Sequence, residues 1–248
     1  MRRFYPLLSI VGFLVLWLVV AWLVNDRLFP GPEKVFMTLI DEVQNGDLFY
    51  HLFITLWRVM ASFVIAMLLG TVIGLAMGRS HLFNGIFDPW LVFFLNVPAL
   101  VIIFLCYIWG GLTETAAILA VVINKVPNVA VMLREGARSL SAELDEMAAS
   151  FRYTNLQRYQ HIIFPQLQPF LAAAGRSGLS LIWKIVLVVE FIGRSDGVGF
   201  QLHTYFQLFN VAAIFAYSVA FIAVMLVIEI VFIQPWERYA TRWRAEPA

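Results

Sequence analysis

The sequence predicts an all-α, polytopic membrane protein with about six transmembrane helices. Of its 248 residues, 61% are hydrophobic and only 13% are charged, about half the charged fraction of an average soluble domain. The mean hydropathy is +0.82. Apolar stretches of about 20 residues, the length that crosses the hydrocarbon core, recur along the whole chain. Lipid is therefore the expected solvent for most of this protein.

Six stretches qualify as spans, and three of them contain polar residues. They cover 7–24, about 56–77, about 90–109, about 115–133, about 170–192 and about 211–233. The third contains Asn96 and Pro98, and the fourth contains Asn124, Lys125, Pro127 and Asn128. The fifth carries Arg176, Lys184 and Glu190. Proline removes a helical hydrogen bond, so kinks are expected at Pro98 and Pro127.

The first stretch follows Arg2 and Arg3, as the core of a secretory signal would. It is longer than a typical signal core, and no small-x-small cleavage site follows it. Asn25, Asp26 and Arg27 come next instead. We therefore expect a retained first helix.

Basic residues in the loops predict the orientation. With the amino terminus inside, ten basic residues fall in inner segments and three in outer loops. The inner set is Arg2, Arg3, Arg79, Arg134, Arg138, Arg152, Arg158, Arg238, Arg242 and Arg244, and the outer set is Arg27, Lys34 and Arg194. Both termini are therefore predicted to be cytoplasmic, which requires an even number of spans.

Several functional classes receive no support from the sequence. A single cysteine, Cys106, cannot form a disulfide within one chain. The histidines, His51, His81, His161 and His203, lie far apart and form no metal-ligand pair at helical spacing. Extended Lys/Arg runs are absent, so nucleic-acid binding is not expected. No cofactor or metal is predicted.

The longest inner segment, 134–164, is polar and lacks a spanning run. Residues 141–151 predict a short helix with Ser141 as its cap. A second helix is predicted at 156–163, before Pro165. Such a pair of helices can dock a soluble partner, or it can be a linker that lies on the membrane.

This segment carries a recognisable pattern of spacing. Permeases of bacterial ABC importers share a cytoplasmic motif of E-A-A, three residues, G, nine residues and I-x-L-P. Here 146–148 (Glu-Met-Ala) takes the E-A-A positions, Arg152 the glycine position and 162–165 (Ile-Ile-Phe-Pro) the I-x-L-P positions. The chain resembles these permeases, with departures at Met147, Arg152 and Phe164.

The resemblance extends over most of residues 29–202 and points to the nitrate/sulfonate/taurine branch. It rests on Thr55-Leu56-Trp57-Arg58-Val59, on Gly70, Gly74 and Gly78, and on Phe87-Asp88-Pro89, Val97-Pro98-Ala99 and Trp109-Gly110-Gly111. Val189-Glu190-Phe191-Ile192-Gly193 and Gly197-Val198-Gly199 complete the ordered set.

The resemblance implies a type I ABC importer permease fold, with residues 1–248 as one permease domain and 139–164 as coupling helices within it. It implies a permease homodimer in the bacterial inner membrane, a cytoplasmic ATPase dimer and a periplasmic or lipid-anchored solute-binding protein. The chain has no G-x-x-x-x-G-K-[ST] loop, so ATP hydrolysis is expected in a separate subunit and this chain is not expected to be an enzyme.

The expected ATPase-coupling residues lie in the motif segment. They are Glu146, Ala148, Ala149, Ser150, Arg152 and Tyr153. A glycine at position 152 would permit a left-handed turn that costs other residues about 1 kcal/mol or more. Arg152 is therefore expected to continue the helix, with the turn at Thr154 and Asn155, or to be a solvated loop charge.

Charges inside spans usually face a cavity or a partner, because burying them in lipid is costly. The pathway candidates are Arg58, Asn96, Lys125, Asn128 and Lys184. A basic excess favours a small anionic solute such as a sulfonate, nitrate or carboxylate. The alternative is that these side chains snorkel, pair internally or bridge helices. Arg176 and Glu190 are expected to be structural.

Gly70, Gly74 and Gly78 recur every four residues, on one face of a helix, and predict close helix packing in lipid. Two other classes of function remain open from the residues alone. An ion-gradient-driven secondary transporter would show an internal repeat with paired broken helices, and none is evident. An intramembrane enzyme would need a nucleophile and base or a metal site.

Overall fold

The computed structural model describes residues 5–242, and every regular element within them is helical. The predicted all-α class is therefore confirmed. The chain divides into two compact units, one of Met1–Leu56 with Glu190–Met225 and one of Trp57–Val189 with Leu226–Ala248. Helices α3 (Leu48–Arg79), α9 (Phe164–Gly193) and α11 (Val211–Ile228) contain residues of both units. Arg2, Arg3 and Arg244, used above for orientation, lie outside the described residues.

The first unit holds α1 (Tyr5–Val24), α2 (Pro32–Gln44) and α10 (Val198–Gln207), with the adjoining parts of the shared helices. Proline at the first position of α2 suits a helix start, because its missing N–H would have no helical acceptor there. The Trp17 indole N–H donates to the carbonyl of Pro30 at 3.1 Å. This bond ties α1 to the chain that leads into α2.

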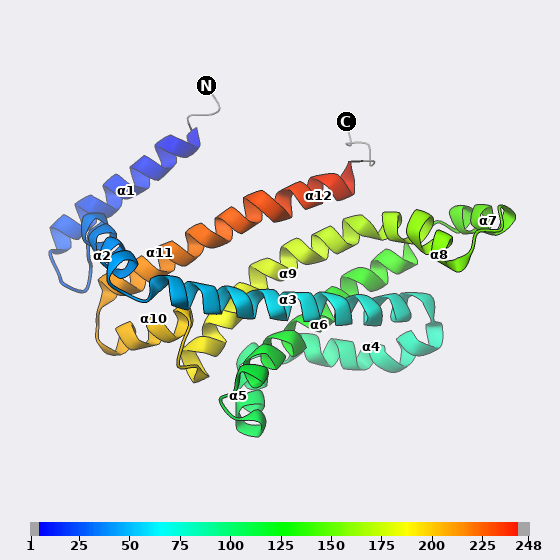
Figure 1. Cartoon of the computed structure of the whole chain (residues 1–248), viewed down its shortest axis with the longest axis horizontal. Coiled ribbons are helices and arrows are strands. Elements are labelled where there is room, and N and C mark those ends of the chain that lie inside the picture. The colour runs from blue at the N-terminus through cyan, green and yellow to red at the C-terminus, as the bar shows by residue number, and fades with distance from the viewer. Residues whose placement is uncertain (1–4, 243–248) are drawn as a thin grey trace. The chain divides into compact units, whose positions relative to one another are not determined.

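The second unit holds the remaining helices (Figure 1). They are α4 (His81–Asn96), α5 (Ala99–Gly110), α6 (Glu114–Arg138), α7 (Ala142–Ser150), α8 (Asn155–Arg158), the π-helical turns η1 (Tyr159–Ile163) and η2 (Glu229–Ile233), and α12 (Gln234–Thr241). Val129 and Leu133 of α6 form an apolar core with Ile163 of η1 and with Leu167 and Ala174 of α9. This core joins α6 to α9.

The third predicted span is a broken pair of helices rather than one kinked helix. Helices α4 and α5 meet at an angle of 97° across Val97 and Pro98. Pro98 precedes the first residue of α5, where its fixed φ of −59° suits a helix start. Pro127 behaves differently, because α6 runs through it without a break.

Gly70, Gly74 and Gly78 of α3 pack closely against another helix, as predicted, and the structure shows that this helix is α6. A Cβ on Gly70 would lie 2.5 Å from the Val129 Cβ, and one on Gly78 would lie 2.5 Å from the Ala137 Cβ. A Cβ on Gly74 would lie 2.5 Å from the backbone carbonyl oxygen of Ala130. The two helices therefore approach so closely that only glycine fits at these positions.

Both π-helical turns end two residues before a proline. Pro165 follows η1 and Pro235 follows η2, and each stands at the second position of the next α-helix. In an α-helix a proline ring collides with the carbonyl four residues earlier, and the wider turn relieves that crowding. The prediction that a second helix ends before Pro165 was therefore wrong, because 155–193 is helical throughout.

Four helical stretches among the described residues are long and apolar enough to cross a membrane, or five if the bent pair forms one span. The four are Leu48–Arg79, Glu114–Arg138, Asn155–Gly193 and Val211–Thr241. The first predicted span coincides with a shorter apolar helix, Leu8–Val24. Each of the six predicted stretches thus coincides with apolar helix.

Candidate functional site

Helix α7 has a capped start and a defined end. The Ser141 hydroxyl accepts a hydrogen bond from the Leu144 N–H at 3.3 Å, which confirms the predicted cap. At the other end the Tyr153 N–H donates to the Ala148 carbonyl at 2.9 Å, and the Arg152 N–H donates to the Ala149 carbonyl at 3.1 Å. These two bonds form a Schellman motif, which stops the helix.

Arg152 does not continue the helix, so that expectation was wrong. Its φ is 52°, in the left-handed region that glycine adopts without cost. The helix ends at Ser150, and Thr154 begins the next helix through a reciprocal cap with Gln157. The backbone at position 152 therefore has the shape that the motif glycine permits, although the side chain is arginine.

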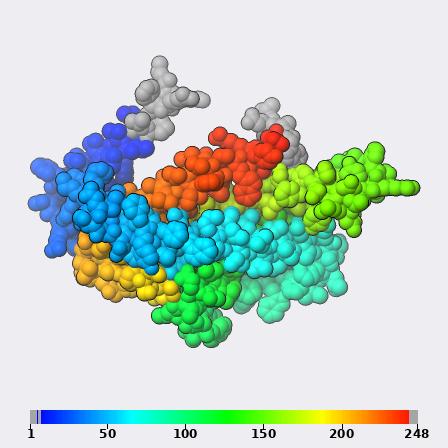
Figure 2. Space-filling model, viewed as in Figure 1, coloured from blue at the N-terminus to red at the C-terminus, as the bar shows by residue number. Residues whose placement is uncertain are grey.

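The predicted coupling residues form an exposed surface with one exception. Glu146, Ala149, Ser150, Arg152 and Tyr153 are exposed, while Ala148 is buried at 1% exposure. In the space-filling view this segment, in light green, projects from the end of the second unit (Figure 2). Ala148 thus lies on the face of α7 that packs against the protein, and the other five residues are exposed and available to a partner.

Two polar contacts hold α7 to the helix that becomes α9. Arg158 donates to both carboxylate oxygens of Asp145, at 3.0 and 2.7 Å. The Ser141 N–H donates to the side-chain oxygen of Gln166 at 2.9 Å. The Arg158 guanidinium lowers the pKa of the Asp145 carboxyl below its ordinary value. These contacts fix α7 to the helix that continues into α9.

A polar cavity of about 780 Å³ lies beside this segment. Its lining residues come from the ends of α3 and α6 and from α4, α7 and α8, and they include Arg79, Arg138, Asp145 and Arg158. The guanidinium of Arg79 also lies over the Tyr159 ring, 5.8 Å from its centre. The surface next to α7 is thus polar and mainly basic.

Most charged residues in the spans pair with another residue of the chain. Arg58 is 2% exposed and makes a two-pronged ion pair with Glu114, with both N···O distances at 2.8 Å. Arg176 pairs with Glu237 at 2.6 Å and lies 3.7 Å from Glu229. Arg58 thus fits internal pairing better than pathway lining, while Arg176 has the structural contacts expected of it.

Glu190 is fully buried and organises the chain around it. Its carboxylate accepts hydrogen bonds from the Thr55 hydroxyl and the Gly199 N–H, both at 2.9 Å. A Cβ on Gly197 would lie 2.4 Å from this carboxylate, and Gly197 has a φ of 101°. The Gly197 N–H donates to His51 Nδ1 at 3.0 Å. This network gives Glu190, Gly197 and Gly199 a structural role in the first unit.

The remaining pathway candidates lie in three different environments. Asn96 is exposed and donates to the Val92 carbonyl of its own helix, while Asn128 donates to the Asn124 carbonyl at 3.4 Å. Lys184 is exposed and lies over the Trp183 ring. Lys125 is 2% exposed, and none of the described residues pairs with it.

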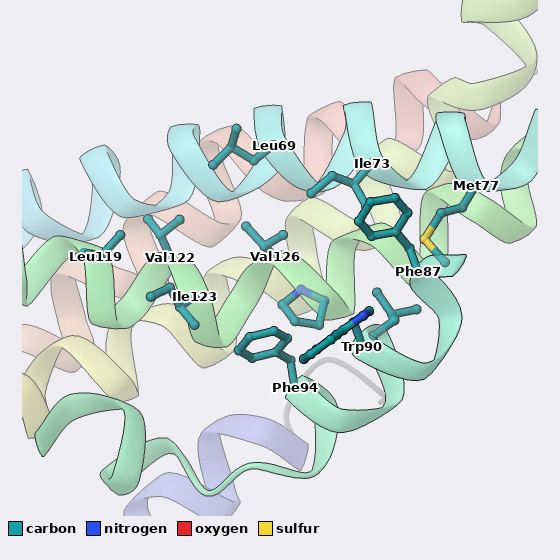
Figure 3. A pocket seen from close by; sticks show the side chains of 12 residues that line it. Leu69, Ile73, Met77, Phe87, Trp90, Phe94, Leu119, Val122, Ile123 and Val126 are labelled. Carbon is teal, nitrogen blue, oxygen red and sulfur yellow. The ribbon is translucent and has the colours of Figure 1, made fainter. Parts of the chain in front are cut away.

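An apolar groove of about 320 Å³ lies between α3, α4 and α6. Figure 3 shows the side chains of Phe87, Trp90 and Phe94 of α4 in the groove, with Phe87 next to Ile73 of α3. Every lining residue is apolar, aromatic or proline. The groove therefore offers no partner to a charged solute.

Sequence reasoning missed three of these partners. Glu114 and Asp145 were not assigned as partners of Arg58 and Arg158, and His51 was considered only as a metal ligand. The partners of Arg58 and His51 lie 56 and 146 residues away, beyond the reach of local periodicity. The i-to-i+13 spacing of Asp145 and Arg158 gave no signal because a turn separates them.

The described residues form apolar helices of spanning length with a projecting capped helix between two of them, which is the architecture of a polytopic membrane protein. Residues 68–234 match the family described as the binding-protein-dependent transport system inner membrane component. The chain belongs to this family, and it is a permease of an ABC importer, as the resemblance implied.

Curated relatives and solved structures agree with this assignment. The chain is 27% identical to the taurine transport system permease protein TauC of Escherichia coli (strain K12), over 95% of this chain and 90% of that protein. It is 24% identical to the bicarbonate transport system permease protein CmpB of Synechococcus elongatus, over 82% and 77%. A solved amino acid ABC transporter shares the fold, with a TM-score of 0.64 at 21% identity, over 81% of this chain and 98% of that one.

Proposed function

We propose that this chain forms the membrane pathway for a small anionic solute and takes its driving force from a separate ATPase through α7. The anionic class follows from the names of its relatives, since taurine carries a sulfonate and bicarbonate is an anion. In this proposal two copies of the chain enclose the pathway in the inner membrane. A cytoplasmic ATPase dimer binds beneath them, and a solute-binding protein delivers the solute from outside.

One observation supports the coupling role most strongly. Helix α7 projects from the unit, yet it is capped at both ends and fixed to the helix of α9 by Asp145–Arg158 and Ser141–Gln166. A rigid projecting element transmits the movement of a bound partner, whereas a flexible linker would absorb it. The exposed face carries the acidic side chain of Glu146, which no described residue pairs.

The test reverses this charge. We expect Glu146→Lys to weaken ATPase binding about tenfold or more, because a lost polar contact at a buried interface costs 1.4 kcal/mol or more. Glu143→Lys is the matched control, since Glu143 is also exposed on α7 but lies in its first turn, outside the motif. The measurements are ATPase retention by the purified complex and the stimulation of ATP hydrolysis by the binding protein. Wild-type retention and stimulation in Glu146→Lys would refute the coupling role.

A further inference from the structure

Lys125 differs from the other charged residues buried in this chain. Arg58 has Glu114, and Glu190 has Thr55 and the Gly199 N–H. Lys125 is as buried as Arg58, at 2% exposure, but no hydrogen bond or ion pair joins its ammonium group to any of the described residues. Nearly the whole lysine side chain is therefore covered by protein.

The position of Lys125 is central to the second unit. It is the twelfth residue of the 25 in α6, so it lies at mid-span. On the facing helix α9, a Cβ added to Gly178 would lie 3.4 Å from the Lys125 Cε and 3.7 Å from the Phe63 ring. Because Gly178 has no side chain, the Lys125 side chain can lie against the backbone near the middle of α9.

Polar groups flank the lysine on its own helix. Asn124 and Asn128 are both half-buried, and the hydrogen bond between them uses only the Asn128 amide N–H₂ and the Asn124 backbone carbonyl. A residue three positions ahead lies about 60° around the helix, so Asn128 shares the face of Lys125. Lysine and asparagine together offer a cationic donor and a neutral amide to one ligand.

An unpaired ammonium group at mid-span costs several kcal/mol, which an internal carboxylate usually compensates. Here no described residue supplies one. We infer that Lys125, with Asn128 beside it, binds the oxyanion group of the transported solute, a sulfonate, carboxylate or bicarbonate group. This inference rests on the proposed function and adds the binding site within one subunit.

The experiment measures anion binding to the purified permease–ATPase complex. The probes are ethanesulfonate, taurine and bicarbonate, compared with sodium chloride at equal ionic strength, and the readout is the rise in the thermal unfolding midpoint with probe concentration. We expect a saturable rise with at least one probe. Lys125→Met should weaken the apparent affinity about tenfold to a hundredfold, as expected for loss of a charge-assisted hydrogen bond. Lys125→Arg, which keeps the cation, should recover part of it.

Lys34→Met is the matched control, because it removes the charge of an exposed lysine on α2, outside the predicted spans. It should bind the probes as the wild type does. Each variant is also measured for ATP hydrolysis stimulated by the binding protein, which reports on assembly and coupling. If the wild type shows no probe-specific rise, or if Lys125→Met keeps it unchanged, the inference is wrong. Intact stimulation in that case would leave the proposed function standing.

Discussion

At the scale of single residues, the backbone conformation of Arg152 is set by the end of α7. The Schellman bonds at the end of α7 require a left-handed residue at this point, and Arg152 adopts a φ of 52° to supply it. A non-glycine residue in that region carries strain of about 1 kcal/mol. Arg152 occupies this position despite that strain, and its exposed side chain is part of the surface that we propose for the ATPase.

The corresponding prediction is that Arg152→Gly raises the stability of the α7 terminus by up to about 1 kcal/mol, because glycine removes the strain. Thermal unfolding of the purified complex measures the change. Arg152→Ala is the control, since it removes the same charge but keeps a Cβ in the left-handed conformation. Equal midpoints for the two variants would show that the backbone strain contributes nothing.

At the scale of helices, the close contact of α3 with α6 depends on glycines, which have no side chain. Gly70, Gly74 and Gly78 all lie too close to α6 for a Cβ. Arg58 and its partner Glu114 add an ion pair between the same two helices. Lipid offers no hydrophobic drive for helix association, so close packing and such polar contacts hold the pair together.

We therefore expect Gly74→Ala to destabilise the protein by about 1–3 kcal/mol, because the new methyl group would meet the backbone oxygen of Ala130. Gly85→Ala is the control, since a Cβ there has no atom within 4 Å and alanine favours the helix. Unfolding midpoints in the same detergent compare the two. A Gly74→Ala protein as stable as Gly85→Ala would contradict the close packing.

At the scale of the whole molecule, the family assignment and the apolar helices define a multi-pass inner-membrane permease. The side of the membrane on which each loop lies remains a prediction from the ten-to-three excess of basic residues. It places α7 and the cavity with Arg79 and Arg138 in the cytoplasm, where an ATPase can reach them.

Reporter fusions test this orientation. A cytoplasm-active reporter fused at Ala248 should be active, because basic residues favour the cytoplasmic side. An export-dependent reporter inserted in segment 26–47, which includes α2 and lies outside in the predicted orientation, should be active as well. The reciprocal reporters at the same positions should be silent. An export-dependent reporter that is active at Ala248 would overturn the six-span arrangement with both termini inside.

The sequence by itself determined the fold class, the positions of the apolar helices, the glycine contact and the capped helix at Ser141. These depend on composition, on spacing of three to four residues and on local hydrogen bonds, all of which act over short stretches of chain. It could not show that Val97 and Pro98 separate two helices at 97°, because a proline is compatible with either a kink or a break.

Only the tertiary structure decided which charged residues are paired. Arg58 and Arg176 find carboxylates 56 and 61 residues away, while Lys125 finds none among the described residues. In the sequence all three are basic residues within apolar stretches and cannot be told apart. Their difference arises because helix packing brings distant side chains together, and the cost of an unpaired charge depends on those neighbours rather than on the local pattern.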